Sequence, residues 1–120
     1  MRYSIGVDDE FLHVMVSGRE ADEPPSDVCE VIFRESRRLG RKRILIQLDQ
    51  KAALSPTSQL MLVNRLPQIG FTVDDRIALV HRTKEIQQAN AFINVAAAKH
   101  GVMVRNFPSL EDAQAWLRAA

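Results

Sequence analysis

Apolar and polar positions alternate with a period of two in two short segments near the start of the chain. In residues 2–7, every second side chain is apolar and its neighbours are smaller or polar. In residues 11–18, Leu12, Val14 and Val16 share one face, and Phe11, His13 and Met15 share the other. This period is typical of half-buried β-strands. The acidic residues 8–10 between the segments are too few for a parallel crossover. The pattern therefore predicts an antiparallel hairpin.

Three later segments predict strands, and they alternate with four helical patterns. Residues 43–49 form a nearly continuous apolar run, typical of a strand covered on both faces, and residues 76–81 and 102–107 predict two more strands. Apolar residues recur at helical spacing after each strand from the second onward. Capping residues mark the expected helix starts, which are Ser26 or Asp27, Ser55 with Pro56, Thr83, and Ser109.

This order of elements predicts one α/β domain spanning residues 1–120, with a mixed sheet of about five strands and four helices. The composition, 46% apolar and 26% charged, is that of an ordinary globular domain. The first residues lack an apolar leader, and no window approaches the roughly 20 apolar residues of a membrane span. We therefore expect a cytoplasmic protein without a transmembrane segment. Cys29, the one cysteine, cannot form a disulfide within the chain.

The second helical pattern has more apolar surface than one sheet contact can bury. Residues 60–63 are consecutive apolar residues, which cover most of a helix circumference. Pro67 predicts that the helix stops or kinks at Leu66 and leaves residues 66–71 as an apolar loop. Either this loop folds back over the helix, or the surface meets a protein partner, a second subunit or a lipophilic ligand. The candidate contact residues are Leu60, Met61, Leu62, Ile69 and Phe71.

Polar residues follow the strands at the edge where open α/β sheets bind ligands. We expect Asp49, His81, Arg82, Thr83 and Asn106 to gather at this carboxyl edge, where helix N-termini could hold an anion. The alternative is that the polar helix starts only cap backbone donors.

An enzyme or a metal site is less favoured by the same residues. Asp49, Ser55 and His81 are residue types of a hydrolytic triad, but no GxSxG elbow is present to expose a nucleophile. The histidines do not occur at a metal-ligand spacing. We therefore predict no catalytic residue, no cofactor and no bound metal.

Six basic residues lie between Arg34 and Arg43, and they raise the question of nucleic-acid binding. Cations are favoured at a helix C-terminus, and Glu30 and Glu35 lie at spacings that allow pairing within the same helix. No aromatic residue is interleaved for base stacking. We predict a solvated charged face and no nucleic-acid partner.

The order of elements and four segments resemble the small stand-alone STAS-like bacterial proteins, which are related to domains of sulfate transporters and anti-sigma-factor antagonists. The segments are YSI.VDDEFLHVMVSG, RILIQLD, RIALV and AKHGVMVRNFPSLEDAQAWL. The resemblance extends over essentially the whole chain. It implies a STAS-like fold and a regulatory or binding role toward a protein, a nucleotide or phosphate, or a lipophilic ligand.

In the anti-sigma-factor antagonists, the strand matching residues 45–49 ends in Asp and is followed by a phosphorylated Ser-Gly pair. Asp49 matches, but the next segment is longer, has no Gly, and brings its first serine at Ser55. Ser55 and Ser58 are therefore the candidate phosphosites. We expect a non-enzymatic module that contacts a protein partner, or a second copy, through the second helix and the loop before it. The alternative is a carrier or sensor of a lipophilic or anionic small molecule, and a serine phosphoswitch or a hydrolase is less favoured.

Overall fold

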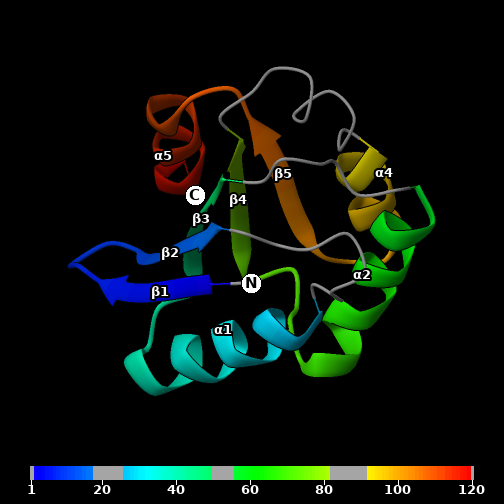
Figure 1. The fold of residues 1–120 in the computed structure, drawn as a ribbon, viewed down its shortest axis with the longest axis horizontal. Coiled ribbons are helices and arrows are strands. Elements are labelled where there is room, and N and C mark those ends of the chain that lie inside the picture. Colours follow the sequence, from blue (N-terminus) through cyan, green and yellow to red (C-terminus); the bar gives the residue numbers. More distant parts are fainter. Residues whose placement is uncertain (1, 18–25, 50–55, 82–91, 120) are drawn as a thin grey trace.

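Five strands form a single sheet in which spatial order follows sequence order (Figure 1). The structure is a computed structural model that describes residues 2–17, 26–49, 56–81 and 92–119. β1 and β2 form the predicted antiparallel hairpin, and β2 to β5 are parallel, so the predicted mixed α/β sheet is confirmed. The strands are β1 Arg2–Val7, β2 Leu12–Ser17, β3 Arg43–Asp49, β4 Arg76–His81 and β5 Met103–Phe107.

In the described ranges, four helices cover the sheet unequally. They are α1 Ser26–Leu39, α2 Pro56–Ile69, α4 Phe92–Lys99 and α5 Leu110–Arg118. Crossovers between parallel strands are right-handed, and here the strand order never reverses. The three crossover helices α1, α2 and α4 therefore lie on one face, and α5, which follows the last strand, lies on the other (Figure 1).

Each face of the sheet carries its own core. The larger core lies under α1, α2 and α4, and strand alternation sends Ile44 and Ile46 of β3 into it. Leu45, between them, faces α5 and joins a smaller core with Phe11 and Leu117. Burial on both faces explains why β3 reads as a continuous apolar run. None of the helices in the described ranges has the length and apolar character needed to cross a membrane.

The α2 helix does not stop at Leu66 as predicted. It continues through Pro67 to Ile69, and Gly70, with φ +132°, follows its end. Proline inside a helix removes a backbone hydrogen bond, but the buried Leu66 and Phe71 hold the last turn against the core and offset this cost. Phe71 packs its ring edge on Phe33, with the centroids 5.0 Å apart. Residues 66–71 are therefore a helix end folded onto the core, not an apolar loop.

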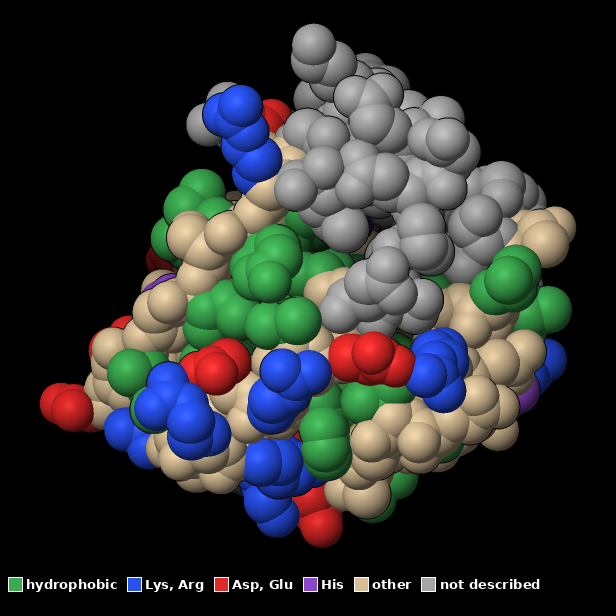
Figure 2. Space-filling view, turned by 60° about the horizontal axis from the view of Figure 1, so that its bottom comes forward, with side chains coloured by type: hydrophobic (Ala, Val, Ile, Leu, Met, Phe, Trp, Pro, Cys, Tyr) green, Lys and Arg blue, Asp and Glu red, His purple; other side chains and the backbone are tan. Residues whose placement is uncertain are grey.

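Figure 2 views the molecule with the bottom of Figure 1 turned forward, and a row of alternating basic and acidic side chains crosses this face. Arg38 binds Glu35 one turn away, at 2.6 Å, as the helical spacing predicted. Glu30 was expected to pair within α1, but it binds Arg65 of α2 at 2.5 Å. The long arginine side chain crosses between the two helices, so a tertiary pair replaces the local one.

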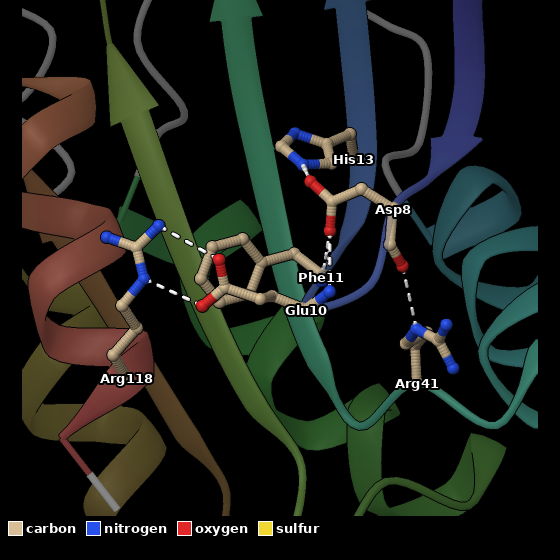
Figure 3. Close-up of polar contacts among 6 residues, drawn as sticks. All are labelled: Asp8, Glu10, Phe11, His13, Arg41 and Arg118. Atoms are coloured by element: carbon tan, nitrogen blue, oxygen red, sulfur yellow. Dashed lines mark hydrogen bonds and ion pairs between the residues drawn. The ribbon is translucent and has the colours of Figure 1, made fainter.

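Two further arginines bind acids far away in the sequence, at the amino edge of the sheet. Arg37 donates two hydrogen bonds, of 2.9 and 2.8 Å, to the carboxylate of Asp75, which is fully buried. Arg118 of α5 donates two hydrogen bonds, of 2.8 and 3.1 Å, to the carboxylate of Glu10 in the hairpin turn (Figure 3). Within the basic run 34–43, Arg37 and Arg38 are thus paired with acidic side chains of the same chain.

Asp8 organises the hairpin turn at the same edge (Figure 3). One carboxylate oxygen accepts hydrogen bonds from the backbone N–H groups of Glu10 and Phe11, both at 2.7 Å. The other lies 2.6 Å from Nε2 of His13, and Arg41 donates to the backbone carbonyl of Asp8. The backbone bond from Phe11 contributes most to lowering the pKa of Asp8 to about 2. The turn is therefore held by local bonds and tied to the segment after α1.

Gly70→Ala tests the close approach at the end of α2. A Cβ at Gly70 would lie 2.6 Å from the ring of Phe33, in a backbone conformation that L-residues rarely adopt. We expect the free energy of unfolding to fall by about 2–4 kcal/mol, from backbone strain and overpacking together. Gly40→Ala is the matched control, because Gly40 also has positive φ but no atom within 4 Å of its Cβ position, and it should cost about 1 kcal/mol. Equal losses in urea unfolding would contradict the proposed clash.

Candidate functional site at the carboxyl edge

The carboxyl ends of β4 and β5 are where the chain leaves the sheet toward opposite faces. The segment after β4 leads to α4 on the larger-core face, and the segment after β5 leads to α5 on the other face (Figure 1). Connections that diverge in this way are where open α/β sheets form ligand crevices. Between the other parallel strands, both connections lead to the same face. This topology singles out the end of β4 and β5.

His81, the last residue of β4, bonds directly to Asn106 of β5 at this position. Its Nε2 lies 2.7 Å from Oδ1 of Asn106. Oδ1 of Asn94, on α4, accepts from both the backbone N–H and the side-chain Nδ2 of Asn106, at 2.9 and 3.1 Å. A β4 residue, a β5 residue and an α4 residue are thus joined in one polar relay.

The relay fixes which nitrogen of His81 carries the proton. The backbone N–H of Asn106 is a donor in every state, so the Asn94 atom that meets it must be the amide oxygen. That oxygen then requires Nδ2 of Asn106 as its second donor, which turns Oδ1 of Asn106 toward His81. An amide oxygen only accepts, so Nε2 of His81 carries the hydrogen. In the neutral ring, Nδ1 is left with a free lone pair.

Nδ1 of His81 is buried and has no hydrogen-bond partner among the described residues. The whole side chain is only 3% exposed. Burial lowers the pKa of His81, and the bond to Asn106 opposes this shift only in part. At neutral pH the site therefore holds an uncharged imidazole whose Nδ1 lone pair meets no donor among the described residues.

The other residues predicted for this edge do not join the relay. Asp49 is exposed at the end of β3, and strand alternation places its side chain on the α5 face, opposite His81. The predicted edge residues Arg82 and Thr83 and the candidate phosphosite Ser55 lie outside the described residues. Ser58 lies in α2, but its side chain is not described. The structure thus joins His81 and Asn106 and separates Asp49 from them.

The predicted α2 surface divides into an exposed part and a buried part. Leu60 and Met61 are 41% and 66% exposed, whereas Phe71 is 3% exposed and belongs to the core. Leu62 and Ile69 are half-buried against the same core. The excess apolar surface of this helix is therefore largely buried inside the molecule, and of the five predicted contact residues Leu60 and Met61 remain exposed.

A cavity of about 40 Å³ lies between α1, α2 and the sheet, lined by side chains including Leu62, Phe71 and Leu79. Pockets that hold drug-sized ligands are roughly 300–1,000 Å³. This cavity is too small for a lipophilic ligand. No cluster of three or more histidine, cysteine or acidic residues suited to a metal ion occurs in the described ranges.

Asn94 is the site residue that sequence reasoning missed. It lies next to the buried Ile93 in a helix, FINVAAAK, that is otherwise apolar up to Lys99, and a polar residue in that setting was the one available signal. The signal is weak, because its meaning depends on the distance between α4 and β5.

Comparisons with known proteins add no relationship: no family model, curated protein or solved structure matches the chain.

The buried relay predicts that stability depends on the protonation of His81. Because the folded state lowers the pKa of His81 below its ordinary 6.5, the unfolded chain binds the extra proton first as pH falls. We expect the free energy of unfolding to be highest above pH 6.5 and to decrease as pH is lowered through that value. Urea unfolding at several pH values, with an NMR titration of the imidazole, measures this effect.

His81→Gln is the informative variant, because the Gln amide can still donate to Asn106 but does not titrate. It should lose the part of the pH dependence that belongs to His81. His100→Gln, at an exposed position, is the control and should keep it. A His81 pKa at or above 6.5 in the folded protein would contradict the buried neutral ring.

Proposed function

We propose that the protein is a non-enzymatic binding module that takes up a small polar molecule at the carboxyl ends of β4 and β5. The observation that carries this proposal is the buried, unpartnered Nδ1 of His81. A buried polar atom without a hydrogen bond costs about 1–3 kcal/mol, so its presence calls for an explanation. A ligand that offers the missing donor supplies one, at the position that the topology also favours.

The chemistry of the relay narrows the ligand class. A neutral imidazole with its hydrogen on Nε2 offers a lone pair at Nδ1, so the ligand should present an O–H or N–H group there. An anion at the same atom would need a protonated ring, which burial opposes. The proposal therefore favours a ligand with a neutral hydroxyl or amide donor over the anion that the sequence suggested.

Binding is favoured over catalysis by what surrounds His81. A histidine base in hydrolysis needs a nucleophile within reach and a group that orients it. Here Nε2 faces an amide oxygen, and Asp49 lies on the opposite face of the sheet. The relay holds the ring in one tautomer, which suits recognition of a donor group.

A protein partner is the second candidate, favoured by the exposure of Leu60 and Met61. Both lie in the first half of α2, the end nearer the carboxyl edge, because α2 follows β3. A partner bound there would approach the same edge as the ligand. This arrangement suits a regulatory module of the STAS-like kind that the chain resembles.

A matched pair of probes tests the ligand site. Phenol offers an O–H donor, whereas anisole has the same ring without the donor. We expect NMR titration of labelled protein to show that phenol perturbs the signals of His81 and Asn106. Anisole should bind about tenfold more weakly, because a tenfold difference in affinity corresponds to roughly one hydrogen bond. Inorganic phosphate should leave these signals unchanged.

Two variants at one position separate the roles of the two ring nitrogens. In His81→Gln the amide nitrogen replaces Nε2 and the Nδ1 acceptor is lost, so the preference for phenol over anisole should disappear. In His81→Asn the amide oxygen can replace Nδ1, so part of the preference should remain. Equal binding of phenol and anisole to the unmodified protein would refute the site.

Replacement of Met61 by a charged residue tests the protein-partner candidate. Met61→Lys should abolish capture of a specific partner without loss of stability, because the side chain is 66% exposed. Val73→Lys is the control, since Val73 is also exposed but lies beyond the far end of α2. Partner capture that is equally insensitive to both changes would count against α2 as the contact surface.

A further inference from the structure

β1 is an open edge of the sheet with apolar side chains. Among the described strands it pairs only with β2, and Tyr3 and Val7 are 48% and 46% exposed. Figure 2 shows hydrophobic side chains gathered on the face beside the row of charges. Edge strands are usually protected by lysine, proline or a bulge. β1 has no lysine or proline, and its six residues pair with β2 in unbroken register.

The hairpin geometry shows which backbone groups point away from β2. The N–H of Asp8 donates to the carbonyl of Phe11, so Asp8 is turned toward β2. In an antiparallel pair, residues alternate between facing the neighbouring strand and facing away from it. Residues 2, 4 and 6 therefore face β2 with Asp8. Tyr3, Ile5 and Val7 direct their N–H and C=O groups to the open edge.

These outward groups allow a second copy to pair in only a few registers. Residues opposite each other across a two-fold axis must both face outward or both face inward, so the axis passes through a residue. An axis at Ile5 places Ile5 against itself and Tyr3 against Val7 of the second copy. It also places Arg2 against Asp8 of the second copy. Apolar pairs and opposite charges across strands are both favourable.

We propose that two copies of the chain associate antiparallel through β1, with the two-fold axis at Ile5, and form a continuous ten-stranded sheet. An axis at Ser4 leaves Asp8 without a charged partner in the second copy, so the register at Ile5 makes more favourable pairs. The axis is perpendicular to the sheet, which keeps α1 of both copies on one face. The exposed sides of Tyr3 and Val7 are then covered. The contact uses neither His81 nor α2, so it is independent of the proposed ligand site.

Cysteine cross-linking tests the register. In a Cys29→Ala background, Ile5→Cys places two thiols across the axis, where hydrogen-bonded residues have Cα atoms about 5.5 Å apart, within disulfide range. We expect mild oxidation to give a product of twice the 13.6 kDa monomer mass on a non-reducing gel. Tyr3→Cys alone should not cross-link, whereas Tyr3→Cys with Val7→Cys should. Cross-linking of Tyr3→Cys as fast as Ile5→Cys would overturn the register.

Sedimentation equilibrium tests the association without cysteine chemistry. The unmodified chain should show a concentration-dependent rise from 13.6 kDa toward twice that mass, and Val7→Lys should remain monomeric. Val95→Lys, at an exposed valine on α4, is the control and should still associate. Thermal unfolding of Val7→Lys confirms that it folds. An unmodified chain that stays at 13.6 kDa at all concentrations would overturn the proposal.

Discussion

The order of the strands is the constraint on which the rest of this structure depends. Each new parallel strand is added beside the previous one in the same direction, so right-handed crossovers place every connecting helix on one face. Among the described helices, α5 alone covers the other face, over β3, β4 and β5. The same constraint leaves β1 with an open edge. It also confines the divergence of connections to the end of β4 and β5, where His81 meets Asn106.

The two edges of the sheet are built from different chemistry. At the amino edge, guanidinium groups bind carboxylates directly, as between Arg37 and Asp75, and these pairs join segments distant in sequence. At the carboxyl edge, the described contacts of His81 are with an uncharged amide. Charged pairs hold strongly but demand fixed geometry, whereas a neutral relay can exchange one hydrogen bond for another. The amino edge therefore joins segments distant in sequence, and the proposed ligand site lies at the uncharged carboxyl edge.

Much of the fold was predictable because its signals are local. The strand segments, the hairpin and the Ser109 cap, which accepts a bond from the N–H of Asp112, depend on residues a few positions apart. The site was predictable only in part. Strand order places His81 and Asn106 at one edge, but their contact depends on the register between β4 and β5, and Asn94 enters from another element. Pro67 misled the prediction because core packing outweighed a local rule near a helix end.

The smaller core under α5 has a consequence for the order in which the chain can assemble. Phe11 and Leu117 meet in it, although they lie near opposite ends of the chain. The larger core joins strands that are neighbours in sequence, so it can grow one strand and helix at a time as the chain leaves the ribosome. The smaller core cannot close until α5 has been synthesised, after all five strands of the sheet. Until then, Phe11 and Leu45 are uncovered, and a helix made late completes the protection of strands made early.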